Sequence, residues 1–347
     1  MKYRRSLIAF VVIAIFLIFL STTKSVYAQE SKPEYVIKIG TLAPEGSVWM
    51  EKLKEIMNII EQKTNSRVKN TFYPGGVMGD EPAMVKKMNL DQLQMGAFTI
   101  YGIYTIAPEM AVMELPFLFE DVSEVDYIRN RVRPVFDEIF EKKGFKLLSW
   151  VDQGGFDQIY SKHPIKNLND LAKQKTWAWT EQPIPIETYK AIGIAPVTTS
   201  VPELLSSLQA GIVDAFYTTP LACLALQWCL QIRYINMLNF KYEAGAVVMT
   251  MKAWNSLPKD IRQIIINEVR AFEPKVIASI RIASDKALMR MIQEGIQVVP
   301  FDPAERELFK KKTRVIYQQL AGKIYSKDLL DRILKDLDKY RTSKKEN

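Results

Sequence analysis

The segment YVIKIGTLAPEGSVWMEKLKEIMNIIEQK, residues 35–63, combines one strand and one helix around a short turn. Residues 35–42 alternate in the manner of a β-strand. Residues 47–63 then repeat apolar side chains at helical spacing, at Trp49, Leu53, Ile56 and Ile60. Ser47 precedes this run and is expected to cap the helix. The segment therefore predicts one β-α unit.

The residues that follow continue the alternation of strand and helix. RVKNTFYPGG (67–76) predicts a strand that ends at Pro-Gly-Gly, residues 80–91 predict a helix, and QMGAFTIYG (94–102) predicts a third strand. A β-α-β-α-β order favours a parallel sheet with ligand contacts at the carboxyl ends of its strands. The fold class predicted from this part is α/β.

The middle of the chain predicts a second run of such elements. IYSKHPI (159–165) and KTWAWT (175–180) are typical of strands, and PIETYKAIG (185–193) of a helix. VTTSVPELLSSLQAGIVDAFYTTP (197–220) predicts a strand, a helix and a strand, with Ser200 and Glu203 at capping-box spacing. Two runs of this kind in a chain of 347 residues indicate two domains.

The C-terminal third begins with KYEAGAVVMTMKAWNSLP (241–258), which is expected to return as a strand to the first sheet. A helical region from about 258 to 294 follows, and Pro274 is expected to kink or interrupt it. After a strand at IQVVP (296–300), Asp302 should cap a further helix. The charged tail after about Tyr340 is expected to be loose.

The first 28 residues are typical of a secretory signal peptide. A basic start precedes an apolar run from Leu7 to Leu20, and Val26-Tyr27-Ala28 is a small-residue cleavage pattern. An uncleaved membrane anchor is the alternative, but the run is shorter than the ~20 residues that a spanning helix needs. We therefore expect a periplasmic protein that is cleaved near Ala28.

Composition argues against several classes of function. The net charge is +8, and four basic residues leave with residues 1–28, so the mature excess of about +4 gives no reason to expect nucleic-acid binding. The only histidine, His163, lies in a turn-like segment, and neither a phosphate-binding loop nor a nucleophile elbow is present in the sequence. No cofactor, metal site or catalytic residue is therefore expected, and the chain is interpreted as a binding protein rather than an enzyme.

The two cysteines, Cys223 and Cys229, are expected to remain free. On one continuous helix, a spacing of six residues separates their Cα atoms by ~9 Å along the axis. This distance exceeds the ~7 Å within which a disulfide can form.

Several of these motifs together resemble the DctP-type family, the periplasmic solute-binding subunits of TRAP transporters. The resemblance begins with residues 39–99 and continues through ELPFLFED (114–121), VPELLSSLQAGIVDAFYTTP (201–220) and AWNSLPKDIRQIII (253–266). It covers nearly the whole mature chain in order. It is specific for the family and says little about the ligand.

The resemblance implies a two-lobe periplasmic binding protein fold with a ligand cleft between the lobes. The implied boundaries are residues 35–149 plus about 240–275 for lobe I, and 150–239 plus about 276–325 for lobe II. Residues 326–347 would form a C-terminal helix and a charged tail. The implied partners are a small-molecule ligand and integral membrane TRAP subunits, which import the ligand with an ion gradient, and the receptor is expected to be a monomer.

The sequence departs from the family where its members hold a carboxylate. In the family, an arginine follows a lysine by two residues and clamps an organic acid through a bidentate pair. In NDLAKQKTWAWT (169–180), Lys175 matches that lysine, whereas the arginine position is Trp177. The second arginine is absent near 156–158, and the expected asparagine position is Thr218 or Thr219.

This departure changes the expected ligand. A carboxylate that enters a closing cleft without a cationic partner meets a desolvation penalty of several kcal/mol. Trp177 and Trp179, two residues apart on one strand, share a face and could form a wall for an aromatic or apolar ligand, or for a cation. In the alternative interpretation, one of the two tryptophans belongs to the core of its lobe.

Strand ends supply the other candidate ligand contacts, although packing is the alternative for each aromatic side chain. Glu181 could bind a ligand amine or hydroxyl, or could lie in an exposed loop. The complete set of predicted ligand-binding residues is Trp177, Trp179, Trp49, Ala43, Phe98, Tyr101, Trp150, Gln153, Tyr217 and Thr218.

The expected function is that of a TRAP-type solute receptor for an organic acid or aromatic ligand that is not a simple arginine-clamped dicarboxylate. A periplasmic ligand receptor for a membrane sensor kinase is the alternative, and an exported hydrolase is a weaker one. The gene neighbourhood distinguishes the first two, because an importer needs membrane subunits nearby.

Overall fold

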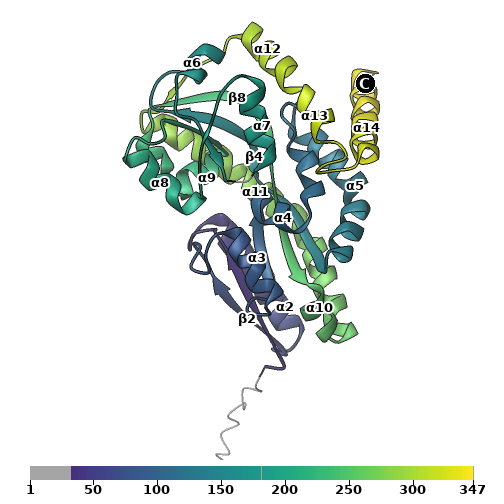
Figure 1. Ribbon diagram of the computed structural model, residues 1–347. Helices are drawn as coiled ribbons and strands as arrows, with labels where there is room; N and C mark the ends of the chain where they lie inside the picture. Colours follow the sequence, from purple (N-terminus) through teal and green to yellow (C-terminus); the bar gives the residue numbers. More distant parts are fainter. Residues whose placement is uncertain (1–32, 181, 347) are drawn as a thin grey trace, which may run out of the picture.

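The computed structural model describes residues 33–180 and 182–346, so the predicted signal peptide and Glu181 lie outside the described residues. One mixed sheet runs through the molecule in the order β2-β1-β3-β8-β4-β7, and β9 pairs with β8. Helices cover its two ends (Figure 1). Within the described residues, no helix is long and apolar enough to span a membrane.

The N-terminal elements confirm the prediction of a parallel β-α-β-α-β unit. They are β1 (Tyr35–Thr41), α2 (Val48–Lys63), β2 (Val68–Tyr73), α3 (Glu81–Asn89) and β3 (Met95–Thr99). β1 pairs in parallel with both β2 and β3. The Ser47 hydroxyl accepts a hydrogen bond from the Met50 amide, so Ser47 is the N-cap of α2 as expected.

Two long antiparallel strands connect the ends of the molecule. These are β4 (Phe145–Ser161) and β8 (Tyr234–Thr250), which pair with each other. β8 also pairs antiparallel with β3, which confirms that residues 241–250 return to the first sheet. The strand predicted at 159–165 is present only over residues 159–161, which form the end of β4. The pair β4–β8 therefore forms the connection between the two halves (Figure 1).

The β4 strand contains a glycine bulge where it crosses between the halves. Its register against β8 shifts between Asp152 and Phe156. Gly154 and Gly155 have φ values of +126° and +99°, which side chains rarely adopt. A bulge of this kind changes the strand direction without ending the strand.

Replacing Gly154 with alanine is expected to destabilise the protein by about 1–3 kcal/mol, because it combines backbone strain with a clash. The new Cβ would lie 2.8 Å from the Ser284 hydroxyl oxygen. Urea unfolding measures the loss. Gly155→Ala is the matched control, because its Cβ meets nothing closer than 3.8 Å and only the backbone strain remains. Equal stability of Gly154→Ala and wild type would contradict this account.

The second half of the molecule carries a small two-stranded sheet, β5 (Trp177–Trp179) and β6 (Val197–Thr199), which pair in parallel. Around it lie α6 (Leu168–Ala172), α7 (Pro183–Ala191), α8 (Val201–Gln209), β7 (Ala215–Thr218) and α9 (Pro220–Ala225). The capping box of Ser200 and Glu203 is present at the start of α8, as predicted.

Both cysteines are free and buried, as predicted. The single helix used for that prediction is absent, because α9 ends at Ala225 and Gln227 is left-handed, with φ +61°. Cys229 instead lies in a short 3-10 helix, η2 (Trp228–Gln231).

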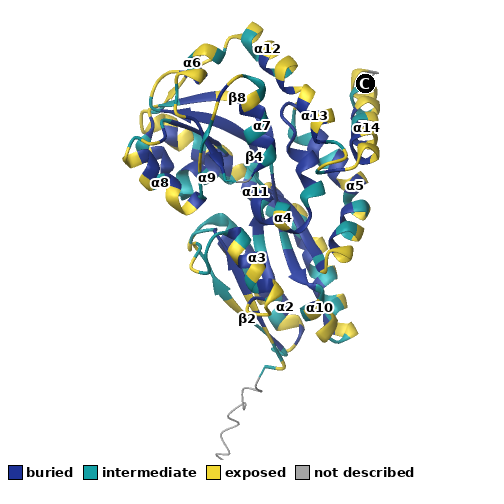
Figure 2. Ribbon diagram, viewed as in Figure 1, coloured by how far each residue is buried: buried dark blue, intermediate teal, exposed yellow. Residues whose placement is uncertain are grey.

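Helices from several parts of the chain pack over the sheet and bury it (Figure 2). They are α4 (Ile100–Ile106), the 3-10 helix η1 (Pro108–Glu114), α5 (Val122–Lys142), α10 (Met251–Ser256) and α11 (Lys259–Gln293). α11 continues through Pro274, so the expected interruption there is wrong. One hydrophobic cluster lies between β1, α2 and the N-terminal half of α11, and a larger one joins the two halves.

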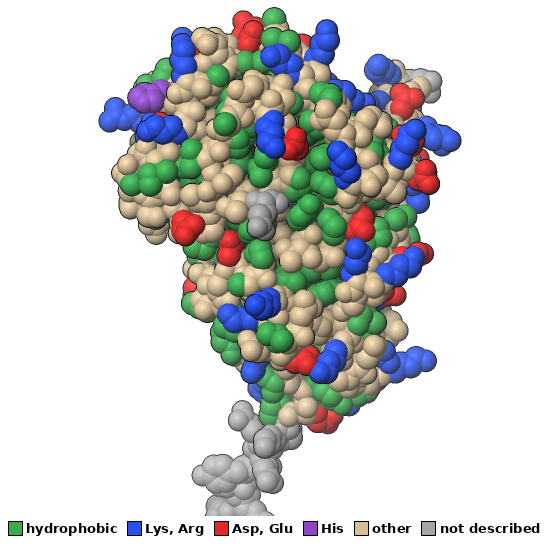
Figure 3. Space-filling view, viewed as in Figure 1, with side chains coloured by type: hydrophobic (Ala, Val, Ile, Leu, Met, Phe, Trp, Pro, Cys, Tyr) green, Lys and Arg blue, Asp and Glu red, His purple; other side chains and the backbone are tan. Residues whose placement is uncertain are grey.

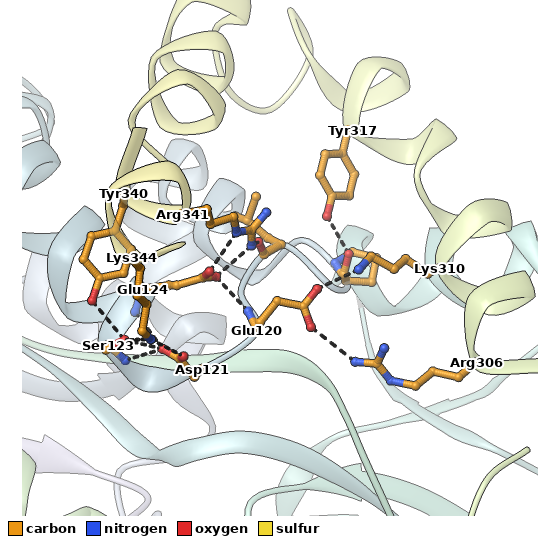
Figure 4. A network of polar contacts seen from close by, with 12 residues as sticks. Glu120, Asp121, Ser123, Glu124, Arg306, Lys310, Tyr317, Tyr340, Arg341 and Lys344 are labelled. Carbon is orange, nitrogen blue, oxygen red and sulfur yellow. Dashed lines mark hydrogen bonds and ion pairs between the residues drawn. The ribbon is translucent and has the colours of Figure 1, made fainter. Parts of the chain in front are cut away.

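The C-terminal elements are β9 (Gln297–Val298), α12 (Pro303–Thr313), α13 (Val315–Leu320) and α14 (Lys327–Glu346). Asp302 caps α12, as predicted, by accepting hydrogen bonds from Ala304 and Glu305. The expectation of a loose tail after Tyr340 is wrong. Arg341 donates two 2.7 Å hydrogen bonds to the Glu124 carboxylate, and Lys344 pairs with Asp121 (Figure 4).

These contacts fix the segment 114–121 against the C-terminal helices (Figure 4). The Arg341 guanidinium also donates to the Leu118 carbonyl, and the Tyr317 hydroxyl donates to the Pro116 carbonyl at 2.6 Å. From α12, Lys310 pairs with Glu120 at 2.6 Å. Residues that lie more than 180 positions later in the chain therefore hold the segment 114–121 in place.

Arg341→Ala is expected to lower the free energy of unfolding by about 1–2 kcal/mol, because it leaves a buried carboxylate without its bidentate partner. The Glu124 side chain is only 6% exposed, whereas Arg341 is 38% exposed, which limits the effect. Chemical denaturation measures it. Lys344→Ala should cost less than about 1 kcal/mol, because its pair with Asp121 is exposed. Equal losses in the two variants would contradict the role of Arg341.

Candidate functional site

A cavity of about 150 Å³ lies at the junction of the two halves. Its walls come from the β1–α2 turn, α2, β3, α11 and the middle of β4 and β8 on one side, and from β5, β7 and α9 on the other. On the face shown in Figure 3, hydrophobic side chains gather around the middle of the molecule. The cavity walls are likewise mainly apolar and aromatic.

Most of the predicted contact residues line this cavity. They are Ala43, Trp49, Phe98, Gln153, Trp177, Trp179, Tyr217 and Thr218. Tyr101 stands behind the wall, with its ring centroid 4.3 Å from that of Trp179. Trp150 does not belong to the lining, because it is fully buried with its ring against Phe136 at 5.1 Å. Glu181 lies outside the described residues.

Trp177 is fixed in the cavity wall by contacts on several sides. Its indole N–H donates to the Thr199 carbonyl at 3.2 Å and to the Thr199 hydroxyl at 3.1 Å. Its ring stacks on Tyr217 at 5.4 Å and meets Trp228 edge-on at 5.9 Å. With only 2% of its surface exposed, Trp177 presents a rigid aromatic face. Its N–H is already paired, so only the ring is available to a ligand.

Trp179 joins the two halves across the cavity. Trp179 belongs to β5, whereas Tyr101, whose ring it contacts at a tilt of 42°, belongs to α4, which follows β3. The side chain of one half thus closes against groups of the other, as expected for a cleft in its closed form.

Two indole nitrogens in the lining, those of Trp49 and Trp179, are buried without a hydrogen-bond partner among the described residues. The Gln153 carbonyl is occupied, because it accepts a 2.8 Å hydrogen bond from the Thr219 hydroxyl. The Trp49 N–H can therefore donate to one ligand oxygen.

Among the described residues, the cavity lining contains no arginine. Its only basic residue, Lys52, is paired with Glu55 at 2.6 Å. Glu81 accepts hydrogen bonds from Thr99 and Gly102, and burial raises its pKa to about 8. Glu273 accepts bonds from Ser149 and Trp150. Glu243, the remaining lining carboxylate, belongs to a separate charged cluster.

That cluster, here called the lysine cluster, consists of Lys241, Glu114, Asp157 and Glu243. The Lys241 ammonium lies 2.8 Å from Glu114, 3.0 Å from Asp157 and 2.5 Å from Glu243. The lysine cluster connects β8 to β4 and to η1, in the region where the two strands pass between the halves of the molecule. Its ammonium also lies 5.5 Å from the centre of the Tyr217 ring, so the cluster borders the aromatic wall.

Burial dominates the protonation of the lysine cluster. It raises the pKa of Glu114 to about 8 and that of Asp157 well above its ordinary value. Burial alone would lower the pKa of Lys241, but Asp157, Glu114 and Glu243 together raise it. The lysine is therefore charged at neutral pH, whereas Glu114 and Asp157 retain protons more readily than free carboxyl groups.

Sequence reasoning did not identify Glu243 or Trp228 as lining residues. Glu243 follows Lys241 by two positions on β8, so the two side chains share one face of the strand. This spacing could have indicated that Glu243 lies beside Lys241. Trp228 is placed by the left-handed turn at Gln227, for which the sequence gives no local signal.

Two solved structures with this architecture are TRAP periplasmic solute-binding proteins. A TRAP periplasmic solute-binding protein from Desulfovibrio salexigens, with bound orotic acid, has a TM-score of 0.80 at 22% identity over 88% of this chain and 99% of that chain. A similar protein from Sulfurospirillum deleyianum, with bound succinate, has a TM-score of 0.79 at 20% identity over 87% and 99%. The fold is thus that of a two-lobe α/β solute-binding protein.

Residues 39–324 match the family model described as bacterial extracellular solute-binding protein, family 7 (DctP). The chain belongs to this family. A relative in Escherichia coli, the 2,3-diketo-L-gulonate-binding periplasmic protein YiaO, is 20% identical over 71% of this chain and 75% of its own length. Family and fold are those of periplasmic solute-binding proteins rather than enzymes.

Proposed function

We propose that this protein is an extracytoplasmic receptor that captures a small ligand by lobe closure and delivers it to TRAP-type membrane subunits for ion-gradient-driven uptake. The observation that carries the proposal is the cavity that both halves of the chain close, with Trp179 of β5 against Tyr101 of α4. Closure of two lobes about connecting strands is a common way to enclose a ligand. Service to a membrane sensor kinase is not favoured by any observation on the molecule.

The ligand is proposed to be a small, partly apolar molecule and not a simple dicarboxylate. A cavity of about 150 Å³ holds roughly one six-membered ring, since an apolar cavity of about that volume binds benzene. The walls offer the faces of Trp177 and Tyr217 and no guanidinium among the described residues. Relatives with the same fold bind succinate and orotic acid, so the scaffold itself accepts flat and linear acids.

The lobes are proposed to meet at the crossing of β4 and β8. Lobe I comprises residues 35–149 plus about 240–275, and lobe II residues 150–239 plus about 276–325, with the C-terminal helix after them. The Gly154–Gly155 bulge is the proposed hinge in β4. The mature chain is proposed to start after Ala28 and to act as a monomer.

Closure and delivery are tested in two steps. Organic acids, aromatic acids and amines are first screened for thermal stabilisation, and small-angle scattering then checks that a stabilising compound makes the protein more compact. Uptake of that compound, labelled, is then measured in cells that express a TRAP-type membrane pair with and without this receptor. We expect accumulation only with the receptor present. A stabilising ligand that leaves uptake unchanged would contradict the delivery step.

A further inference from the structure

The wall beside Trp177 contains more carboxyl groups than cations. Glu114, Asp157 and Glu243 surround one ammonium group, that of Lys241. Three of the four side chains are at most 3% exposed, whereas Glu243 is 13% exposed and lines the cavity. The group of the lysine cluster that a ligand can contact is therefore the Glu243 carboxylate.

The lysine cluster holds a proton that a cation could replace. Burial raises the pKa of Glu114 to about 8 and that of Asp157 well above its ordinary value, so these carboxyl groups retain a proton at neutral pH. Lys241 contributes one positive charge against three potential negative ones. An additional cation beside Glu243 would neutralise the second carboxylate and release that proton.

Aromatic rings complete a site for a cation. Tyr217 lines the cavity and stacks with Trp177 at 5.4 Å, and one face of its ring already receives the Lys241 ammonium. A carboxylate next to aromatic faces binds organic ammonium groups through a charge-assisted hydrogen bond and cation–π attraction. The hydrocarbon part of the same molecule can lie against Trp177.

We propose that the ligand carries a protonated amine, that Glu243 binds this amine, and that its ring or hydrocarbon body packs on Trp177. The inference rests on the proposed receptor function and specifies its ligand class. The ionisable groups that face Glu243 are Lys241 on its own strand, Asp157 on β4, Glu114 on η1 and Tyr217 on β7. Binding of the amine displaces one proton from this set.

Three probes of nearly equal size separate charge from shape. Benzylamine is cationic, benzyl alcohol neutral and benzoate anionic, and each is titrated calorimetrically at pH 7. Wild-type protein is expected to bind benzylamine at least tenfold more tightly than benzyl alcohol, and benzoate least. Titrations in phosphate and in Tris, which differ in ionisation enthalpy, should show proton release with benzylamine only.

Two variants assign the effect to the lysine cluster. Glu243→Gln should weaken benzylamine at least tenfold, abolish proton release and leave benzyl alcohol unchanged. Glu138→Gln, at an exposed carboxylate on α5, is the matched control and should change none of these values. Asp157→Asn retains Glu243 but removes one of the buried carboxyl groups around Lys241, so benzylamine should still bind, with less proton release.

Tight benzoate binding, or unchanged benzylamine binding in Glu243→Gln, would overturn this inference while leaving the receptor function intact. The same holds if benzylamine fails to bind but other compounds stabilise the protein. If no compound of any charge stabilises wild type, the proposed receptor function fails together with the inference.

Discussion

Trp177→Ala is expected to weaken ligand binding at least about 100-fold and to lower the free energy of unfolding by about 3–5 kcal/mol. Trp177 forms one wall of the cavity and holds Tyr217 and Trp228 in place. Its removal enlarges the cavity and frees the Thr199 carbonyl and hydroxyl, which accept its N–H. Calorimetric titration with a stabilising ligand, together with urea unfolding, measures both losses.

Trp254→Ala is the matched control for this change. Trp254 is 7% exposed, packs in the other hydrophobic cluster and does not itself line the cavity. It should lose comparable stability and keep the ligand affinity of wild type. Trp177→Arg should also weaken the native ligand and gain affinity for carboxylates, because it places a guanidinium at the clamp position. Unchanged ligand affinity in Trp177→Ala would show that this wall is packing alone.

Lys241→Met is expected to cost about 3–5 kcal/mol at pH 8.5, because it leaves buried carboxyl groups without their cation. A carboxyl group whose pKa is raised by folding contributes stability that is complete below its unfolded pKa and is lost as the pH rises through the folded pKa. For Glu114 this window runs from 4.5 to about 8. The variant should therefore lose less at pH 5, where its carboxyl groups are more easily protonated, than at pH 8.5.

Thermal and urea unfolding at the two pH values measure this difference. Lys142→Met serves as the control, because the Lys142 side chain is 77% exposed and its pair with Glu138 lies in solvent. It should change stability by less than about 1 kcal/mol at both pH values. Equal losses for Lys241→Met at pH 5 and pH 8.5 would contradict the protonation scheme.

Local patterns were sufficient to predict the N-terminal unit. The helical spacing in α2, the Ser47 cap and the Ser200–Glu203 capping box depend on neighbours within a few residues. Period-two spacing also placed Trp177 and Trp179 together in the cavity wall. The same alternation explains Trp150. Val151 and Gln153 of β4 line the cavity, so Trp150 projects from the opposite face into the core.

Contacts between distant residues were not predictable from these patterns. Gly154 and Gly155 are typical of a turn, but pairing with β8 keeps β4 continuous through a bulge. The tail after Tyr340 has a composition typical of a loose end, yet Arg341 pairs with Glu124, which lies 217 residues earlier. Lys241 likewise meets Glu114 and Asp157 only because β8 lies beside β4 and near η1.

The central claim is that the cavity receives a ring-sized ligand on Trp177 without an arginine clamp. Calorimetric titration of wild-type protein with benzylamine, benzyl alcohol, benzoate and succinate tests it most directly. The account predicts that at least one ring compound binds with one-to-one stoichiometry and at least tenfold more tightly than succinate, and that Trp177→Ala removes this binding. Tight binding of succinate, with every ring compound weaker, would contradict it.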